Sequence, residues 1–112
     1  MNKGLDVIVL FYTSNPCKLC EDLWPFYIQA AKVLHRTQDL RFTSIDMGQN
    51  ELAELHNIFY YPTIRYFPRD SKHRPYDYDA GLSMEDIIEF VKRVSSLSLV
   101  EDYSIIENEI TK

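Results

Sequence analysis

The feature that most constrains this chain is a short apolar run that ends just before a pair of cysteines. The run, residues 6–12, reads DVIVLFY and is rich in β-branched residues. A near-continuous apolar run of this length is typical of a strand buried on both faces of a parallel sheet. Cys17 and Cys20 follow shortly after it, where the sequence takes up the spacing of an amphipathic helix. We therefore expect the pair at the carboxyl edge of a sheet, where α/β folds usually build their sites.

The rest of the chain alternates between strand-like and helix-like segments. The patterns predict strands over residues 6–12, 40–47, 63–67 and 73–81, and helices over residues 17–36, 50–59 and 83–94. Alternation that ends in a hairpin indicates an α/β fold with a central mixed sheet and helices on both faces. The sequence shows no internal repeat. We interpret residues 1–97 as one domain and residues 98–112 as a tail or linker.

Size and charge exclude several classes of protein. A chain of 112 residues is long enough for one hydrophobic core and too short for two. The net charge is -5, and no block of Lys or Arg is present, so neither nucleic acid nor an anionic membrane surface is an expected partner. No apolar run approaches the roughly 20 residues that a membrane-spanning helix needs.

The cysteine pair has a spacing that suits redox chemistry. A helix N-terminus stabilises an anion, so a thiolate at Cys17 would be the nucleophile, and Cys20 lies one turn away, close enough to form a disulfide with it. Lys18 would favour the thiolate, whereas Glu21 and Asp22 would oppose it. A structural disulfide, two inert thiols and half of a zinc site are the alternatives. Zinc needs about four ligands and the three histidines are scattered, so we predict no metal and no other cofactor.

Several separated motifs resemble a catalytic domain of the protein disulfide isomerase family, which has the thioredoxin fold. The motifs lie within residues 5–95 and read VIVLFYTSNPCKLC, LWPFY, FYYPTIRYFP and YDYDAGLSMEDIIEFVKR. The resemblance implies a thiol-disulfide oxidoreductase or disulfide isomerase, with Cys17 and Cys20 as catalytic residues. It also implies unfolded or cysteine-containing polypeptides as partners, other domains of a longer chain as further partners, and the lumen of the endoplasmic reticulum as the location.

The same resemblance implies a substrate-binding segment at Tyr61 and Pro62. The peptide bond between them is expected to be cis, which an X–Pro bond tolerates, and the backbone of Tyr61 would then pair with an extended substrate. The alternative is a plain trans proline at the start of a strand. Aromatic residues would cluster near the cysteines as a platform for unfolded polypeptide or as ordinary core packing: Tyr12, Trp24, Phe59, Tyr60 and Tyr61.

Departures from the family pattern concern the second cysteine. Where the family carries a buried Glu and a mobile Arg, this chain has Leu10 and Leu82, and Glu21 stands in place of a Lys. Lys18 and Leu19 replace Gly-His between the cysteines. Apolar surroundings would disfavour the thiolate of Cys20 and slow its attack on a mixed disulfide. We therefore expect slower exchange than in ordinary family members or, as the alternative, a client-binding module without efficient turnover.

The start of the chain is a further departure, because the family has a strand and a helix before the strand that leads to the cysteines. Only five residues precede the run at 6–12. We expect the sheet to lack that strand-helix unit and to have a bare edge. The alternatives are that the chain is an excerpt of a longer protein or that residues 97–103 cover the edge.

Overall fold

The computed structural model describes residues 4–14, 16–48 and 58–106, which form a four-stranded sheet and two long helices. The predicted helix over residues 50–59 lies almost entirely outside the described residues. In chain order the elements are β1 (Asp6–Tyr12), α1 (Lys18–Val33), β2 (Leu40–Asp46), β3 (Thr63–Phe67), β4 (Tyr76–Asp77) and α3 (Met84–Val94).

The sheet is mixed, as the order of elements predicts. Its strands lie in the order β2-β1-β3-β4, with β1 parallel to β2 and antiparallel to β3, and β3 antiparallel to β4. Ile8 and Leu10 on β1 are fully buried, because this strand has neighbours on both sides and helices above it. The central position of β1 fixes where the chain emerges toward the two cysteines.

Strand β4 is much shorter than the predicted span of residues 73–81. Pro75 precedes it and has no N–H to donate to a ladder, and Arg74 donates its N–H to the carbonyl of Ser71 within a turn (2.9 Å). Tyr78 donates one more backbone hydrogen bond to Ile64 (2.9 Å) before the chain turns toward α3. The hairpin therefore has only a short second arm.

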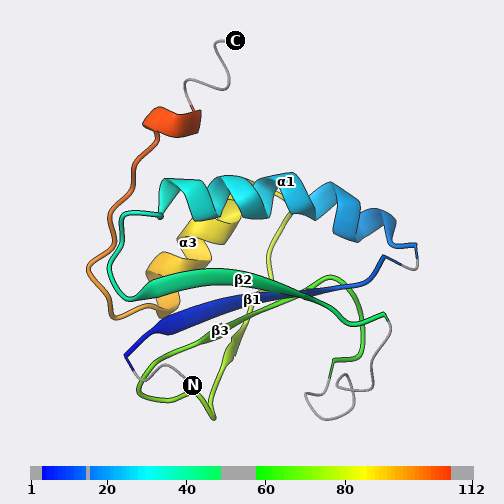
Figure 1. Cartoon of the computed structure of the whole chain (residues 1–112), viewed down its shortest axis with the longest axis horizontal. Helices are drawn as coiled ribbons and strands as arrows, with labels where there is room; N and C mark the ends of the chain where they lie inside the picture. Colours follow the sequence, from blue (N-terminus) through cyan, green and yellow to red (C-terminus); the bar gives the residue numbers. More distant parts are fainter. Residues whose placement is uncertain (1–3, 15, 49–57, 107–112) are drawn as a thin grey trace.

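Helices α1 and α3 pack on the same face of the sheet, as Figure 1 shows. Leu23, Tyr27 and Ala30 of α1 and Ile87 and Phe90 of α3 belong to one buried cluster with the β1 side chains that face them. The opposite face of β1 belongs to a smaller cluster formed by Val9, Phe11, Met47 and Ile58. We predicted helices on both faces of the sheet, and one of the three predicted helices, over residues 50–59, lies almost entirely outside the described residues.

Capping residues set the start of each helix. Ser83 caps α3 by accepting the N–H of Asp86 on its hydroxyl (3.0 Å). Cys17 is the N-cap of α1 and accepts the N–H of Cys20 on its sulfur (3.1 Å). The helix begins at Lys18, one residue later than predicted, because the backbone of Cys17 is extended.

The end of α1 is fixed by the tail. Val33 is its last residue, three before the predicted end, and its carbonyl accepts the N–H of Asp102 (2.8 Å). Thr37, just beyond, exchanges hydrogen bonds with the backbone of Val100. Ile106 is buried in the main cluster. The tail thus runs along the end of α1 (Figure 1), and among the described residues β2 remains the edge strand, without a strand on its outer side.

A tyrosine ties the first helix to the two strands beneath it. The hydroxyl of Tyr27 lies within hydrogen-bonding distance of the carbonyls of Ile8 (3.0 Å) and Thr43 (2.7 Å). Burial raises the pKa of this hydroxyl, which keeps it neutral and able to donate. The contact holds α1 at a fixed height above the sheet and with it the cysteines at the start of the helix.

The amino end of β1 carries a buried polar cluster. The Asp6 carboxylate accepts a hydrogen bond from the Tyr66 hydroxyl and another from the N–H of Arg69 (2.8 Å). Burial and the hydrogen bond to Asp6 raise the pKa of Tyr66. Among the described residues, no buried side-chain nitrogen or oxygen lacks a partner. The cluster anchors the end of the sheet that is remote from the cysteines.

Candidate active site

The two cysteines form a disulfide at the start of α1, shortly after the end of β1. Their Cα atoms are 5.2 Å apart, a separation that falls within the usual range for a disulfide. Cys17 is the N-cap residue and Cys20 lies in the first turn, and the sulfur of Cys17 accepts one of the N–H groups that have no partner inside the helix. The sequence predicted this placement from the run at 6–12 and the helical spacing that follows it.

The two sulfur positions differ in their access to solvent. Cys20 is 5 % exposed, whereas Cys17 is only partly buried. An incoming disulfide can therefore reach Cys17 more easily than Cys20. Since the positive end of the helix dipole favours an anion at the N-terminus, reduction of the pair would leave Cys17 as the better placed thiolate.

The charged residues next to the pair do not act equally on it. The Lys18 ammonium lies 3.2 Å from the carboxylate of Asp22, and its side chain is 82 % exposed. Its charge is therefore partly compensated and well screened by water. Glu21, in contrast, lines the pocket beside the two cysteines. The sequence predicts that Glu21 opposes the thiolate but not that it lines a pocket; its spacing of four residues from Cys17 is the signal that places both on one side of the helix start.

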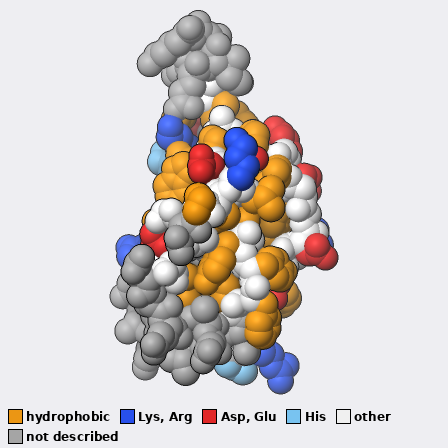
Figure 2. Space-filling model, turned by 90° about the vertical axis from the view of Figure 1, so that its right-hand side faces the viewer, with side chains coloured by type: hydrophobic (Ala, Val, Ile, Leu, Met, Phe, Trp, Pro, Cys, Tyr) orange, Lys and Arg blue, Asp and Glu red, His pale blue; other side chains and the backbone are white. Residues whose placement is uncertain are grey.

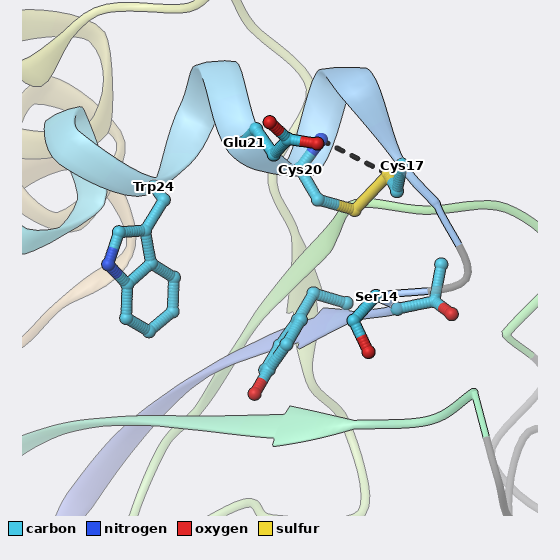
Figure 3. Close-up of a pocket in the computed structure, with 7 residues that line it drawn as sticks. Ser14, Cys17, Cys20, Glu21 and Trp24 are labelled. Carbon is cyan, nitrogen blue, oxygen red and sulfur yellow. Dashed lines mark hydrogen bonds between the residues drawn. A yellow bond between two sulfur atoms is a disulfide. The ribbon is translucent and has the colours of Figure 1, made fainter.

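A pocket of about 560 Å³ opens beside the disulfide (Figure 3). Tyr12 and Trp24 face each other on its apolar side, with ring centroids 5.7 Å apart and planes tilted by 57°. Ser14 lies on the wall near the end of β1 and donates its hydroxyl to Asp46 of β2 (3.0 Å). The pocket is lined by Tyr12, Thr13, Ser14, Cys17, Cys20, Glu21 and Trp24.

Tyr61 and Pro62 lie at the same edge of the sheet as the cysteines. The peptide bond between them is cis. Thr63, the next residue, pairs with Phe11 in the antiparallel register of β1 and β3, which sets Pro62 beside the carboxyl end of β1. The Thr63 hydroxyl donates to the carbonyl of Tyr60 (2.6 Å) and fixes the loop. Pro62 lines a second pocket of about 180 Å³, and neither cysteine lines that pocket.

The two leucines that replace charged residues of the family have different environments. Leu10 is fully buried in the main core. Leu82 is 46 % exposed and lines the second pocket together with Leu23 and Pro62. Leu82 is not among the described residues that line the cysteine pocket, so its contribution to apolar surroundings of Cys20 stays a prediction.

The predicted aromatic platform is divided between several surfaces. Tyr12 and Trp24 line the cysteine pocket, Tyr60 lines the second pocket, and Tyr61 packs against the smaller core cluster. Phe59 is 82 % exposed. Figure 2 looks onto the end of the molecule where α1 begins, and hydrophobic side chains gather in the middle of this face. Of the five aromatic residues of the predicted platform, Tyr12 and Trp24 are therefore the two that line the pocket with the cysteines.

Metal binding and membrane insertion find no support in the described residues. No cluster of three or more His, Cys, Asp or Glu side chains there could hold a metal ion. No helix in the same part of the chain has the length and apolar character needed to cross a membrane.

Comparison with known proteins identifies the family. Residues 1–93 match the family model named Thioredoxin. The chain belongs to the thioredoxin family. Its similarity to protein disulfide-isomerases extends over most of its length: 29 % identity over 107 residues with a protein disulfide-isomerase of Schizosaccharomyces pombe, and 33 % over 89 residues with that of Gallus gallus.

These matches cover 95 % and 78 % of this chain but 30 % and 17 % of the respective relatives, so the chain spans less than a third of their length. The solution structure of the first thioredoxin domain of mouse protein disulfide-isomerase A4 superimposes with a TM-score of 0.63 at 27 % identity, covering 80 % of this chain and 62 % of that one. The thioredoxin fold and the resemblance to protein disulfide-isomerase domains, both predicted from the sequence motifs, are confirmed.

Proposed function

We propose that this domain catalyses thiol-disulfide exchange with cysteine-containing polypeptides through Cys17 and Cys20. The observation that carries the proposal is the disulfide at the N-terminus of α1, whose two sulfur positions differ in exposure. A helix terminus supplies the N–H groups and the dipole that stabilise a thiolate, and the pocket beside Cys17 supplies room for a client chain. The similarity to protein disulfide-isomerases agrees with this chemistry.

The reaction proceeds in two exchanges that conserve electrons. In the reduced domain, the Cys17 thiolate attacks one sulfur of a client disulfide, the client S–S bond breaks, and its other sulfur leaves as a thiolate. A bond now joins Cys17 to the client. The Cys20 thiolate then attacks the Cys17 sulfur, the client leaves as a thiolate, and the domain holds the Cys17–Cys20 disulfide while the client has been reduced. The reverse sequence oxidises a client dithiol.

The second exchange is the slow one in this proposal. Cys20 is 5 % exposed, and burial disfavours the thiolate it must form. Glu21 is the one acidic or basic side chain among the described residues that line the pocket, and its negative charge opposes a thiolate further. The client should therefore remain attached to Cys17 longer than in a domain with a buried base beside its second cysteine.

Tyr61 and Pro62 contribute substrate binding in the same proposal. They lie at the carboxyl end of β1, where an extended client could pair with the backbone of Tyr61 before its disulfide reaches Cys17. The relatives suggest that other domains of a longer chain assist in client binding and that the lumen of the endoplasmic reticulum is the location. Both belong to the proposal.

The test is selective alkylation of the reduced domain at mildly acidic pH, followed by mass spectrometry. Cys17 should be modified rapidly and Cys20 slowly, because only Cys17 combines the helix terminus with access to solvent. Catalysed reduction of a disulfide-linked fluorescent peptide should accompany this difference and disappear in Cys17→Ser. Equal, slow alkylation of both cysteines without peptide reduction would refute the proposal.

A second candidate function is client binding without turnover, which the exposure of Phe59 (82 %) and Tyr60 (68 %) favours. Large apolar side chains in contact with water commonly mark an interaction site. The Cys17→Ser, Cys20→Ser double variant should then bind a labelled unfolded peptide as the wild type does, whereas Phe59→Ser with Tyr60→Ser should not. Tyr76→Ser, which removes a half-exposed ring on β4, is the matched control. Loss of binding in the cysteine variant would exclude this function.

A further inference from the structure

The pocket beside the cysteines combines an apolar wall with a single charge. Figure 3 shows Trp24 on one side, the disulfide on another and Glu21 above the opening. Tyr12 pairs with Trp24 at the distance of an aromatic contact (5.7 Å between centroids), so the two rings form one continuous surface. Any side chain that enters the pocket next to Cys17 meets both the rings and the carboxylate.

The Glu21 carboxylate is not paired with a cation in the part of the chain that the structure describes. No described residue forms an ion pair with it, and the nearest basic residue in the sequence, Lys18, has its ammonium 3.2 Å from Asp22 instead. Lys18 does not line the pocket. A negative charge with an adjoining aromatic surface and no partner of its own is therefore presented to whatever binds beside Cys17.

The second pocket, on the Pro62 side of the same sheet edge, carries charge of the same sign. Its charged lining residues are Asp77 and Asp79. Asp77 forms an ion pair with Arg65, whose Nε lies 2.6 Å from the carboxylate. Asp79 is exposed, and no described residue forms an ion pair with it. Both pockets at this end of the sheet thus carry acidic side chains, and none of the described residues that line them is basic.

We propose that the domain selects client polypeptides that carry a Lys or Arg next to the reactive cysteine. The inference rests on the proposed function and names the substrate class of that site. The aliphatic stem of the basic side chain would lie on Tyr12 and Trp24, and its charged head would pair with Glu21. An acidic side chain at the same position would meet Glu21 with a like charge, so discrimination arises from repulsion as well as attraction.

The cation of the client also acts on the chemical step. Glu21 repels the negative charge that Cys17 must carry to attack the client disulfide, since both line one pocket. A client cation beside Glu21 offsets this repulsion at the moment of attack. A basic client would therefore react faster as well as bind more tightly, whereas a neutral client would gain neither advantage.

The test compares three peptides that differ only in the two residues flanking one cysteine: Lys, Gln or Glu. Each cysteine carries a chromogenic aromatic thiol as a mixed disulfide, and the domain is first reduced with a dithiol that is then removed. Attack by Cys17 forms the Cys17–peptide bond and releases the coloured thiolate, which reports the second-order rate constant. At low ionic strength the Lys peptide should react about fivefold faster than the Gln peptide, the gain expected of one partly exposed ion pair, and the Glu peptide slower still.

Glu21→Gln should bring the three rate constants within about twofold of one another, because it removes the charge and keeps the size of the side chain. Glu85→Gln is the matched control. Glu85 also lies in the first turn of a helix but lines neither pocket, so the preference for the Lys peptide should persist. Equal rates in the wild type, or an unchanged preference in Glu21→Gln, would overturn the inference while leaving exchange itself intact.

A binding measurement separates this inference from the proposed function. Trp24 is the only tryptophan in the chain and lines the pocket, so its fluorescence reports occupancy. Analogues with Ser in place of the peptide cysteine cannot react, and the Lys analogue should perturb Trp24 at a lower concentration than the Glu analogue. Absence of exchange with every peptide would refute the proposed function, and the Trp24 titration alone would then support or overturn charge selection.

Discussion

Polar groups at the two ends of β1 have opposite environments: those at the amino end are buried and hydrogen-bonded, and those at the carboxyl end remain accessible. At the amino end, Asp6 is 2 % exposed, and both of its carboxylate oxygens accept hydrogen bonds, from Tyr66 and from the backbone of Arg69. At the carboxyl end, the chain leads into a disulfide, an open pocket and a carboxylate, Glu21, that has no ion-pair partner among the described residues.

The difference shows which end of β1 contributes to stability and which end is available for binding. A buried carboxylate is tolerated only when hydrogen bonds replace those it makes with water, so the amino end must keep its hydrogen-bonded arrangement. Aromatic rings and a charge that remain in contact with solvent lower stability slightly and give a partner something to bind. Substitutions at the two ends should separate stability from reactivity. The largest effect is expected at the cysteine pair and the smallest at the charge of Lys18.

Replacement of Cys17 should have the largest effect. Cys17→Ser removes the thiolate that attacks the client, so the rate of mixed-disulfide formation should fall by at least about a thousandfold. Cys20→Ser should keep this first step, because Cys20 acts only in the second. The measurement is the rate of chromogenic thiol release from a peptide disulfide. A Cys20→Ser variant as inactive as Cys17→Ser would break the assignment of roles.

Loss of the buried charge at the amino end should cost stability without changing the chemistry. Asp6→Asn replaces one accepting oxygen with an N–H₂ that faces a donor, which should lower the free energy of unfolding by about 1–3 kcal/mol. Asp70→Asn, a change at an exposed residue that follows Arg69, should stay within about 0.5 kcal/mol of wild type. Urea denaturation measures both. A slower Cys17 reaction in Asp6→Asn would show that the two ends are not independent.

Removal of the pocket's aromatic wall should weaken peptide binding with little change in stability, whereas Asp6→Asn should lower stability without changing the chemistry. Trp24 is 40 % exposed and contacts Tyr12, so Trp24→Leu should weaken the binding of an unfolded peptide about fivefold with little change in stability. Tyr76→Leu alters a ring of similar exposure on β4, outside the cysteine pocket, and should leave binding as it is. Fluorescence anisotropy of a labelled peptide provides the comparison. Equal losses in both variants would mean that general surface hydrophobicity governs binding.

The smallest effect is expected at Lys18, although this residue lies between the cysteines. Its ammonium is paired with Asp22 and exposed to water, so Lys18→Gln should change the alkylation rate of Cys17 by less than about twofold. Glu21→Gln should accelerate that reaction more than Lys18→Gln slows it, because Glu21 lines the pocket with the sulfur. A larger effect of Lys18→Gln than of Glu21→Gln would show that a position between the cysteines matters more for the alkylation rate than ion pairing with Asp22 and screening by water.

The features that local patterns determine were predictable from the sequence. The run at 6–12 is short, nearly continuous in apolar residues and rich in β-branched ones, which is typical of a buried strand. Ser83 with Asp86 marks the start of α3. The position of Cys17 at a helix terminus follows from the same kind of reasoning. Each of these depends on residues that are neighbours in the chain, which explains why the elements and the reactive pair could be located.

Features that depend on distant contacts were harder to predict. The end of α1 at Val33 is set by a hydrogen bond from Asp102 in a tail whose sequence has no clear period. The exposure of Leu82 depends on how the turn before α3 lies against β4, which no local pattern encodes. The resemblance to the family indicated that Leu82 takes the place of a charged residue, but the separation of the cysteine and Pro62 pockets required the structure.

The central claim is that Cys17 captures a client readily and Cys20 releases it slowly. Its most direct test mixes the reduced domain with a peptide disulfide, quenches the reaction with acid at successive times and quantifies the covalent Cys17–peptide species by mass spectrometry. We predict that this species accumulates in the wild type and decays more slowly than it forms, whereas in Cys20→Ser it accumulates and persists. Decay as fast as formation in the wild type, with no detectable accumulation, would contradict the account.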